Sequence, residues 1–276
     1  MTETFFSLLE KRVQDSSSLI CIGINPNSSN IPSLSSASAP DFCLNLINQT
    51  APYAAAFKIN PAHFEIFGLE SWTVLKQVID AIHEESARLG STIPVILDAR
   101  YNDTRSTAEA NARFAFEHLG AHCITLNPYL GQDSIEPFVR NPEKGAFLIC
   151  KTSNAGSMDI QNLLILPIGS DSPMPLYNYV AKLTQQWNIN NNLGIIVDAA
   201  HPQIMSNIRA SAPDLWFLSS GINTQSGDLE LALKAGLRAD GSGMLIDISL
   251  SIANITNEPA RAVKDLRDKI LDFIRN

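Results

Sequence analysis

The chain has 276 residues, of which 45% are hydrophobic and 17% charged, and its formal net charge is −8. This composition excludes a disordered chain, and the acidic balance argues against a general nucleic-acid binder. No stretch approaches the roughly 18 consecutive apolar residues of a membrane helix, and the N-terminus lacks a signal-peptide layout. We therefore expect a cytoplasmic protein that binds neither nucleic acid nor membrane.

The cysteines and histidines show no pattern of a disulfide framework or a metal site. The four cysteines are Cys21, Cys43, Cys123 and Cys150, and none forms a CxxC pair. Three of them lie in apolar, strand-like runs, which favours buried free thiols in a reducing compartment. The five histidines are scattered without metal-ligand spacing, so no metal is expected.

Short apolar runs alternate with amphipathic segments along the whole chain. The runs predict strands at residues 19–24, 54–58, 93–97, 122–126, 146–151, 193–197, 216–218 and 243–248. Helices are predicted between them, beginning with one capped by Thr2 and ending with one that opens at Glu258-Pro259. Residues 27–40 and 155–172 are predicted to be long loops.

Eight strands that alternate with helices are typical of a (β/α)8 TIM barrel, here one α/β domain covering residues 1–276. The alternative is an open doubly wound sheet. That fold favours a glycine-rich phosphate loop after its first strand, and Asn25-Pro26-Asn27 is not such a loop.

The stretch from Ile96 to Thr107 concentrates charge at one junction between a strand and a helix. Asp98 and Arg100 follow the apolar run and point the same way if the chain stays extended, and Asp103 comes shortly after. α/β folds carry their chemistry at such junctions. A solvated ion pair in a loop explains this stretch alone equally well.

The carboxyl ends of barrel strands line one mouth, so the residues there are the candidate site. A lone lysine such as Lys58 is more often a partner in an ion pair than a catalyst, but its neighbours Asp98 and Arg100 make a functional role equally plausible. The predicted mouth residues are Asn25, Lys58, Asp98, Arg100, Asn127, Thr152 to Asn154, Asp198, Gln225 and Asp247.

Several motifs resemble those of one family. They are Phe57-Lys58-Ile59-Asn60, Asp98-Ala99-Arg100-Tyr101-Asn102-Asp103, Leu126-Asn127-Pro128-Tyr129-Leu130-Gly131, Lys151-Thr152-Ser153-Asn154 and the segment 221–228. Together they resemble the longer, bacterial-type orotidine 5′-monophosphate decarboxylases of pyrimidine biosynthesis. The resemblance implies a barrel and a cofactor-free decarboxylase that forms UMP and carbon dioxide.

The resemblance also implies roles for individual residues. The family's catalytic Lys-Asp-Lys-Asp array, carried over, is Lys58, Asp98, Arg100 and Asp103. In the family the last aspartate comes from the neighbouring subunit, so Asp103 and Thr107 are expected near the partner's site in a homodimer. The remaining expected contacts with the nucleotide are Asn25, Ser153 and Gln225.

The chain departs from the family at the groups that carry the reaction. Arg100 replaces the lysine that protonates the substrate carbanion, Asn25 replaces a ribose-binding aspartate, and Leu250 replaces a phosphate-binding arginine. The phosphate motif at residues 220–227 lacks two of the family's glycines, and Asp198 stands where a small neutral residue is usual.

These substitutions predict that decarboxylase activity is lost or strongly reduced. The domain would then persist as a dimerising or scaffold unit, associated with or fused to orotate phosphoribosyltransferase. The alternative is a working decarboxylase with a rearranged site, or a related activity on another ligand. Lys58, Asp98, Asp103, Thr107, Ser153 and Gln225 remain and support that alternative.

Overall fold

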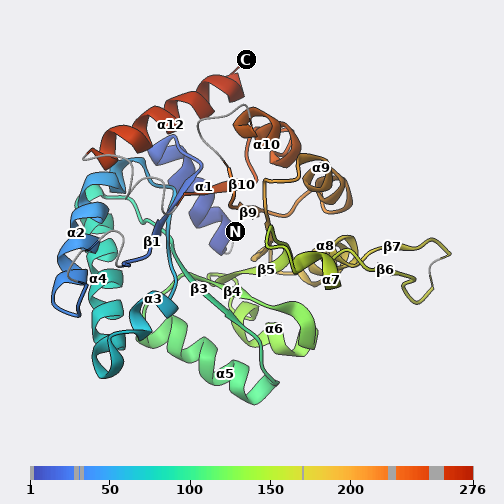
Figure 1. Ribbon diagram of the computed structural model, residues 1–276, viewed down its shortest axis with the longest axis horizontal. Helices are drawn as coiled ribbons and strands as arrows, with labels where there is room; N and C mark the ends of the chain where they lie inside the picture. The colour runs from blue at the N-terminus through green and yellow to red at the C-terminus, as the bar shows by residue number, and fades with distance from the viewer. Residues whose placement is uncertain are drawn as a thin grey trace.

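The structure is a computed structural model that describes residues 3–27, 31, 34–169, 171–222, 228–248 and 258–275. Within these ranges, eight parallel strands close into a barrel in the order β1-β10-β9-β8-β5-β4-β3-β2 (Figure 1). The barrel strands are β1 Ile20–Ile24, β2 Ala56–Ile59, β3 Val95–Tyr101, β4 Cys123–Leu126, β5 Gly145–Lys151, β8 Leu193–Val197, β9 Phe217–Ser219 and β10 Met244–Ile248. The predicted (β/α)8 barrel is therefore confirmed.

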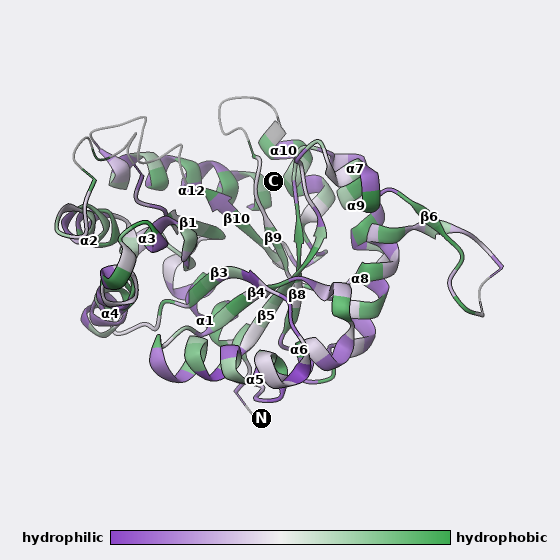
Figure 2. Ribbon diagram, turned by 60° about the horizontal axis from the view of Figure 1, so that its bottom comes forward, coloured by the Kyte–Doolittle hydropathy of each residue, from purple (hydrophilic) through white to green (hydrophobic). Residues whose placement is uncertain are grey.

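Helices surround the barrel and cover the outer faces of its strands (Figure 1). They are α1 Phe5–Ser16, α2 Ser38–Thr50, α3 Ala62–Glu65, α4 Ser71–Leu89, α5 Arg105–Arg113, α6 Gln132–Val139, α7 Ser157–Ile160, α8 Leu176–Trp187, α9 Pro202–Ser211, α10 Asp228–Gly236 and α12 Pro259–Arg275. A π-helical turn, Phe114–His118, continues α5. In Figure 2 the hydrophobic colour runs along the central strands, while hydrophilic residues gather on the surrounding helices.

The longest helix, α4, illustrates how the sequence forms this layer. Apolar residues recur on one face at helical spacing, and the structure buries Val74, Leu75, Val78, Ile79 and Ile82. Gly90 ends the helix in the left-handed conformation at φ 64°, which glycine adopts without the steric penalty of a side chain.

Aromatic side chains from α1 close the amino-terminal end of the barrel. The Phe6 ring stacks on Trp216 with ring centroids 5.9 Å apart, and both side chains are buried. Phe5 lies directly against Gly145, where a Cβ would come within 2.3 Å of the Phe5 ring. The amino-terminal end of the barrel is therefore packed with aromatic side chains.

Two details differ from the sequence-based expectations. The cap of α1 is Thr4 and not Thr2, because the Thr4 hydroxyl accepts from the Ser7 N–H while the Ser7 hydroxyl accepts from the Thr4 N–H. The expected loop at 155–172 contains α7 and β6 Leu164–Ile165, and β6 pairs antiparallel with β7 Met174–Pro175, just beyond that range, to form an arm. Figure 1 shows this arm projecting away from the barrel.

The four cysteines are buried free thiols, as expected. None of the helices in the described residues is long and apolar enough to cross a membrane.

Replacing Phe6 with alanine is expected to lower the free energy of unfolding by about 3–5 kcal/mol, because the cavity sits between fixed aromatic rings. Urea denaturation measures this loss. Leu69→Ala, at a fully exposed side chain, is the control and is expected to stay within about 0.5 kcal/mol. A Phe6 variant as stable as the control would show that α1 does not close the barrel.

Candidate active site

A buried ion pair between Lys58 and Asp98 lies at the centre of the mouth. Lys58 on β2 pairs in register with Ile96 on β3, and Asp98 is two residues further along β3, so all three side chains face the barrel interior. The Lys58 Nζ lies 2.8 Å from the Asp98 Oδ2, and these side chains are only 9% and 4% exposed. The interpretation of residues 96–107 as a solvated loop ion pair is therefore wrong for Asp98.

A bulge in β3 turns Arg100 back toward Asp98. The pairing between β3 and β4 shifts register between Leu97 and Tyr101, and Arg100 adopts φ 51°. Its backbone N–H donates to the Thr125 hydroxyl at 3.0 Å, and that hydroxyl donates to Asp98 Oδ1 at 2.8 Å. The Arg100 Nε lies 3.4 Å from the same oxygen. Asp98 and Arg100 do point the same way, but through a bulge and not through extended chain.

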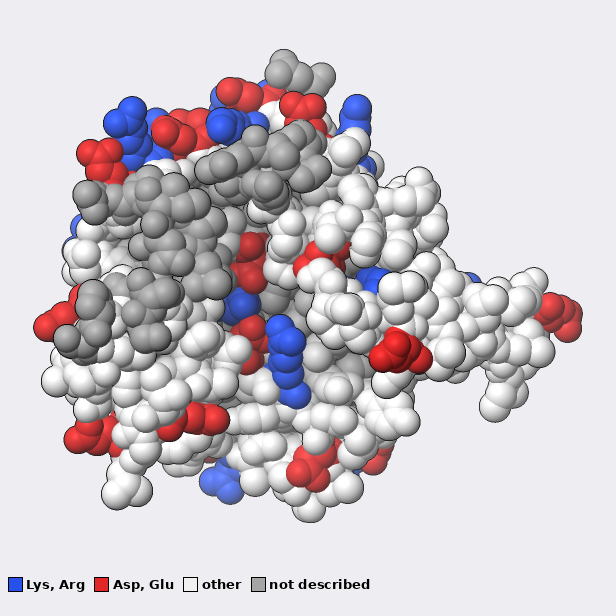
Figure 3. Space-filling model, in the orientation of Figure 1, with Lys and Arg blue, Asp and Glu red and all other residues white. Residues whose placement is uncertain are grey.

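Asp247 at the end of β10 adds a second carboxylate to Lys58. The Lys58 Nζ lies 3.3 Å from Asp247 Oδ2, and the Asp247 side chain is 8% exposed. Four charges of alternating sign therefore follow one another across the mouth, in the order Asp247, Lys58, Asp98 and Arg100. Figure 3 shows acidic and basic side chains side by side in the hollow at the centre of this face.

The alternating charges determine the protonation states of Lys58 and Asp98. Burial alone would lower the pKa of Lys58, but the Asp247 and Asp98 carboxylates outweigh it and hold that pKa above its ordinary value. Burial alone would raise the pKa of Asp98, but the Lys58 ammonium, with help from Arg100 and Thr125, holds it below its ordinary value. Both groups are therefore charged at neutral pH.

The other predicted site residues do not join this array within one chain. Asn25 is half-buried beyond β1, and its Oδ1 is buried without a hydrogen-bond partner among the described residues. Asp103 and Thr107 are exposed, and Asp103 Oδ1 accepts from the backbone N–H of Thr104. Ser153 is exposed beyond β5. Gln225 and Leu250 lie outside the described residues.

Asp198 fills the space where the predicted phosphate motif begins. Its Oδ1 accepts from the Ala200 N–H at 2.9 Å, and its Oδ2 accepts from the Ser220 hydroxyl at 3.0 Å. Gly221 follows at φ 79°, and a Cβ there would lie 2.5 Å from Asp198 Oδ1. A buried carboxylate therefore lies directly against the backbone that opens the motif.

Lys151 holds the loop that carries Ser153. Its buried Nζ donates to the Ser157 hydroxyl at 2.8 Å and to the Thr152 carbonyl at 3.2 Å, and burial lowers its pKa. Sequence reasoning gave no role to Lys151 or to Thr125. Each lies at the end of an apolar run, where strand alternation alone indicates that the side chain is buried or faces the mouth.

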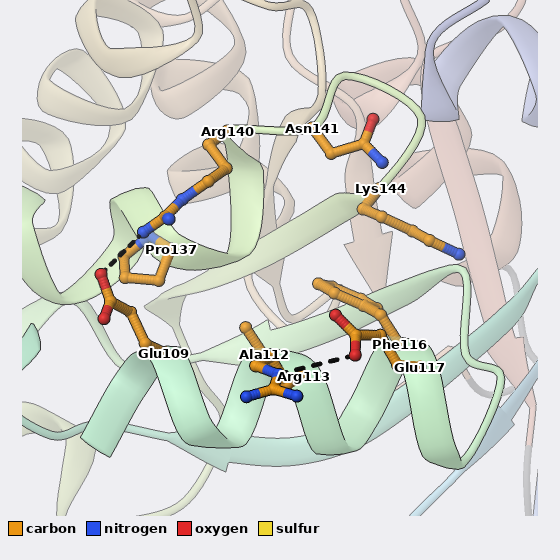
Figure 4. A pocket seen from close by; sticks show the side chains of 9 residues that line it. All are labelled: Glu109, Ala112, Arg113, Phe116, Glu117, Pro137, Arg140, Asn141 and Lys144. Carbon is orange, nitrogen blue, oxygen red and sulfur yellow. Dashed lines mark hydrogen bonds and ion pairs between the residues drawn. The ribbon is translucent and has the colours of Figure 1, made fainter. Parts of the chain in front are cut away.

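Several hollows lie on the outside of the barrel. One of about 400 Å³ separates α5 from α6, and Figure 4 shows Arg140 paired with Glu109 and Arg113 with Glu117 at its edges. A second, of about 670 Å³, lies beside β5 and α8 and is lined by Ser157 among others. Neither contains a residue of the charged array. Among the described residues, no group of three or more His, Cys, Asp or Glu could hold a metal ion.

Comparisons with known proteins agree on one family. A family model described as "Orotidine 5′-phosphate decarboxylase / HUMPS family" matches residues 18–249. An orotidine 5′-phosphate decarboxylase of Roseiflexus castenholzii is 35% identical over 281 residues, which cover 98% of each chain.

Two solved structures from Leishmania donovani share the fold. Its OMP decarboxylase is 43% identical with a TM-score of 0.86, and the match covers 99% of this chain and all of that one. Its UMP synthase is 44% identical with a TM-score of 0.87, and the match covers 99% of this chain but 57% of the synthase.

The closed barrel, with paired charges at the carboxyl ends of its strands, defines a (β/α)8 protein, the class whose active sites lie at that mouth. The chain belongs to the orotidine 5′-phosphate decarboxylase family and is an OMP decarboxylase-like protein of pyrimidine biosynthesis.

Replacing Asp98 with asparagine is expected to cost about 3–5 kcal/mol of unfolding free energy at pH 7, because Lys58 loses a charged partner in a buried site. The folded pKa of Asp98 is below the ordinary value of 3.8, so its contribution is present above that pH and is lost as the pH falls through the folded pKa. The difference between wild type and variant, measured by urea denaturation, should therefore shrink under acid conditions.

The control for this prediction is Asp80→Asn, which breaks the exposed pair between Lys76 and Asp80. Exposed pairs contribute about 0–1 kcal/mol, so this variant should remain close to wild type. Equal losses for the two variants would contradict the special position of Asp98.

Proposed function

We propose that the chain keeps the decarboxylase fold and a nucleotide site while its decarboxylase activity is lost or strongly reduced. The observation that carries this proposal is Arg100, which stands where the family has its proton-donating lysine. Its Nε lies 3.4 Å from Asp98 Oδ1. A guanidinium holds its proton far more firmly than an ammonium does, so it is a poor donor to a carbanion. Proton transfer from a placed side chain typically contributes about 10²–10⁴-fold to a rate.

The phosphate side of the site supports the same proposal. Buried Asp198 lies against Gly221, so a phosphate bound to this backbone would meet a carboxylate. Leu250 offers no charge where the family has an arginine, and loss of one charge-assisted contact costs on the order of 1.5–3 kcal/mol. Because remote binding energy also lowers the barrier, the chemical step suffers together with affinity.

One observation favours the alternative of a working decarboxylase with a rearranged site. The Lys58–Asp98 pair is intact, buried and hydrogen-bonded to Thr125, as a functioning charged site requires. In that case, or with another ligand, Arg100 would act as a fixed positive charge beside the reacting ring, and another group would supply the proton. The proposal needs no cofactor or metal in either case.

We further propose that residues 1–276 form one domain that works as a homodimer. Asp103, just before α5, and Thr107, in the first turn of α5, are both exposed, so they can approach the site of a second copy. The match to about half of a UMP synthase supports association with, or fusion to, orotate phosphoribosyltransferase. The barrel would then contribute dimerisation and a scaffold.

The purified wild-type chain is expected to turn over orotidine 5′-monophosphate far more slowly than about 1 s⁻¹, the low end of typical turnover numbers. The loss of absorbance of the substrate, with carbon dioxide release as a second readout, measures this rate. Turnover at or above that rate would rule out the proposal and favour the rearranged site.

The double variant Arg100→Lys, Leu250→Arg is expected to raise the decarboxylation rate by at least 10²-fold, because it supplies both a proton donor and a phosphate charge. Arg100→Met with Leu250→Arg is the matched control, which supplies the phosphate charge without a donor. If the double variant gains no more than its control, the missing ammonium is not what limits the reaction.

A further inference from the structure

The ion pair between Lys58 and Asp247 crosses β1 at a point where that strand has a glycine, Gly23, beside Lys58. β1 lies between β2 and β10, with Gly23 in register with Lys58 and Cys21 in register with Asp247. Registered residues of parallel strands face the same side, so all four residues face the barrel interior. Because Gly23 has no side chain, Lys58 and Asp247 meet across β1 at 3.3 Å.

This contact reduces the positive charge and the number of ammonium protons of Lys58 that remain available to a ligand. The ammonium has three protons. One is directed at Asp98 Oδ2 at 2.8 Å, and Asp247 Oδ2 lies within ion-pair distance on the other side. Both carboxylates are buried, so water screens them little. Lys58 is therefore already neutralised before a ligand arrives.

We infer that Asp247 is a specificity-determining residue of the mouth, selecting pyrimidine nucleotides that carry no carboxylate on the ring over those that do. This inference rests on the proposed function, in which the mouth holds a pyrimidine nucleotide. A ring carboxylate that enters the mouth must compete with two carboxylates for Lys58 and lies close to both. A ring without that group needs no charged partner and meets only a neutral ion-pair array.

The remaining positive charge does not remove this selection. The Arg100 side chain is 55% exposed and lies against Asp98, so water screens it and a buried carboxylate already faces it. The geometry therefore favours a nucleotide of the decarboxylated, UMP type over orotidine 5′-monophosphate.

The test compares the dissociation constants of UMP and orotidine 5′-monophosphate by calorimetry in wild type and Asp247→Asn. The variant is expected to bind orotidine 5′-monophosphate at least tenfold more tightly and to change its affinity for UMP by less than threefold. Asp247→Ser repeats the test if the asparagine variant does not fold. Asp240→Asn, which removes an exposed carboxylate from the loop before β10, is the control for a general change in net charge.

A purely structural role for Asp247 would change both affinities together. Equal changes for both ligands, or no change for either, would overturn the inference, and so would an equal gain in the Asp240 variant. If wild type binds neither nucleotide but Asp247→Asn binds orotidine 5′-monophosphate, the proposed nucleotide site of the wild type fails while the role of Asp247 stands. If wild type proves to be an active decarboxylase, the ratio is obtained from KM and from inhibition by UMP, and the same tenfold criterion applies.

Discussion

The mouth of this barrel depends on the burial of one ammonium and one carboxylate beside each other. Lys58 and Asp98 are 2.8 Å apart with side chains less than a tenth exposed, so loss of either removes the shortest charged contact of the other in a site with little water. Three neighbouring side chains contact this pair. The β3 bulge brings Arg100 and Thr125 to one oxygen of Asp98, and Asp247 reaches Lys58 from the opposite side. The barrel brings these five side chains together from four strands.

The fold was predictable because barrel strands buried on both faces form short apolar runs. All eight predicted runs overlap the observed barrel strands. The arm formed by β6 and β7 was missed, because two-residue strands are too short to produce a periodic pattern and their flanking sequence resembles a loop. The cap of α1 was misplaced because both Thr2 and Thr4 have a suitable side chain, and only the reciprocal contact with Ser7 distinguishes them.

Contacts between residues close in sequence were predictable. Contacts that depend on the pairing of the first barrel strand with the last were not. Asp98 and Arg100 are two residues apart in sequence, so their proximity was predictable, although a bulge at Arg100 and not strand alternation turns both toward the same side. The contact between Lys58 and Asp247 exists only because β1 pairs with both β2 and β10, the pairing that closes the first strand against the last. Asp247 could be placed at the mouth from the sequence, but its partner could not be identified. Asp103 and Thr107 are exposed in one chain, so only a second copy can test their expected role.

Burial also distinguishes the charges of the mouth by how strongly the fold depends on them. Removing Asp98 leaves buried Lys58 with one carboxylate partner in place of two, and removing Lys58 leaves two buried carboxylates without the ammonium between them. Arg100, with 55% of its side chain exposed, is under no such constraint, because water can solvate its charge. Asp247 balances Lys58 from within the same chain, so the four charges of the array sum to zero within one copy. A barrel of this kind can therefore change an exposed charge at its mouth while the buried pair stays in place.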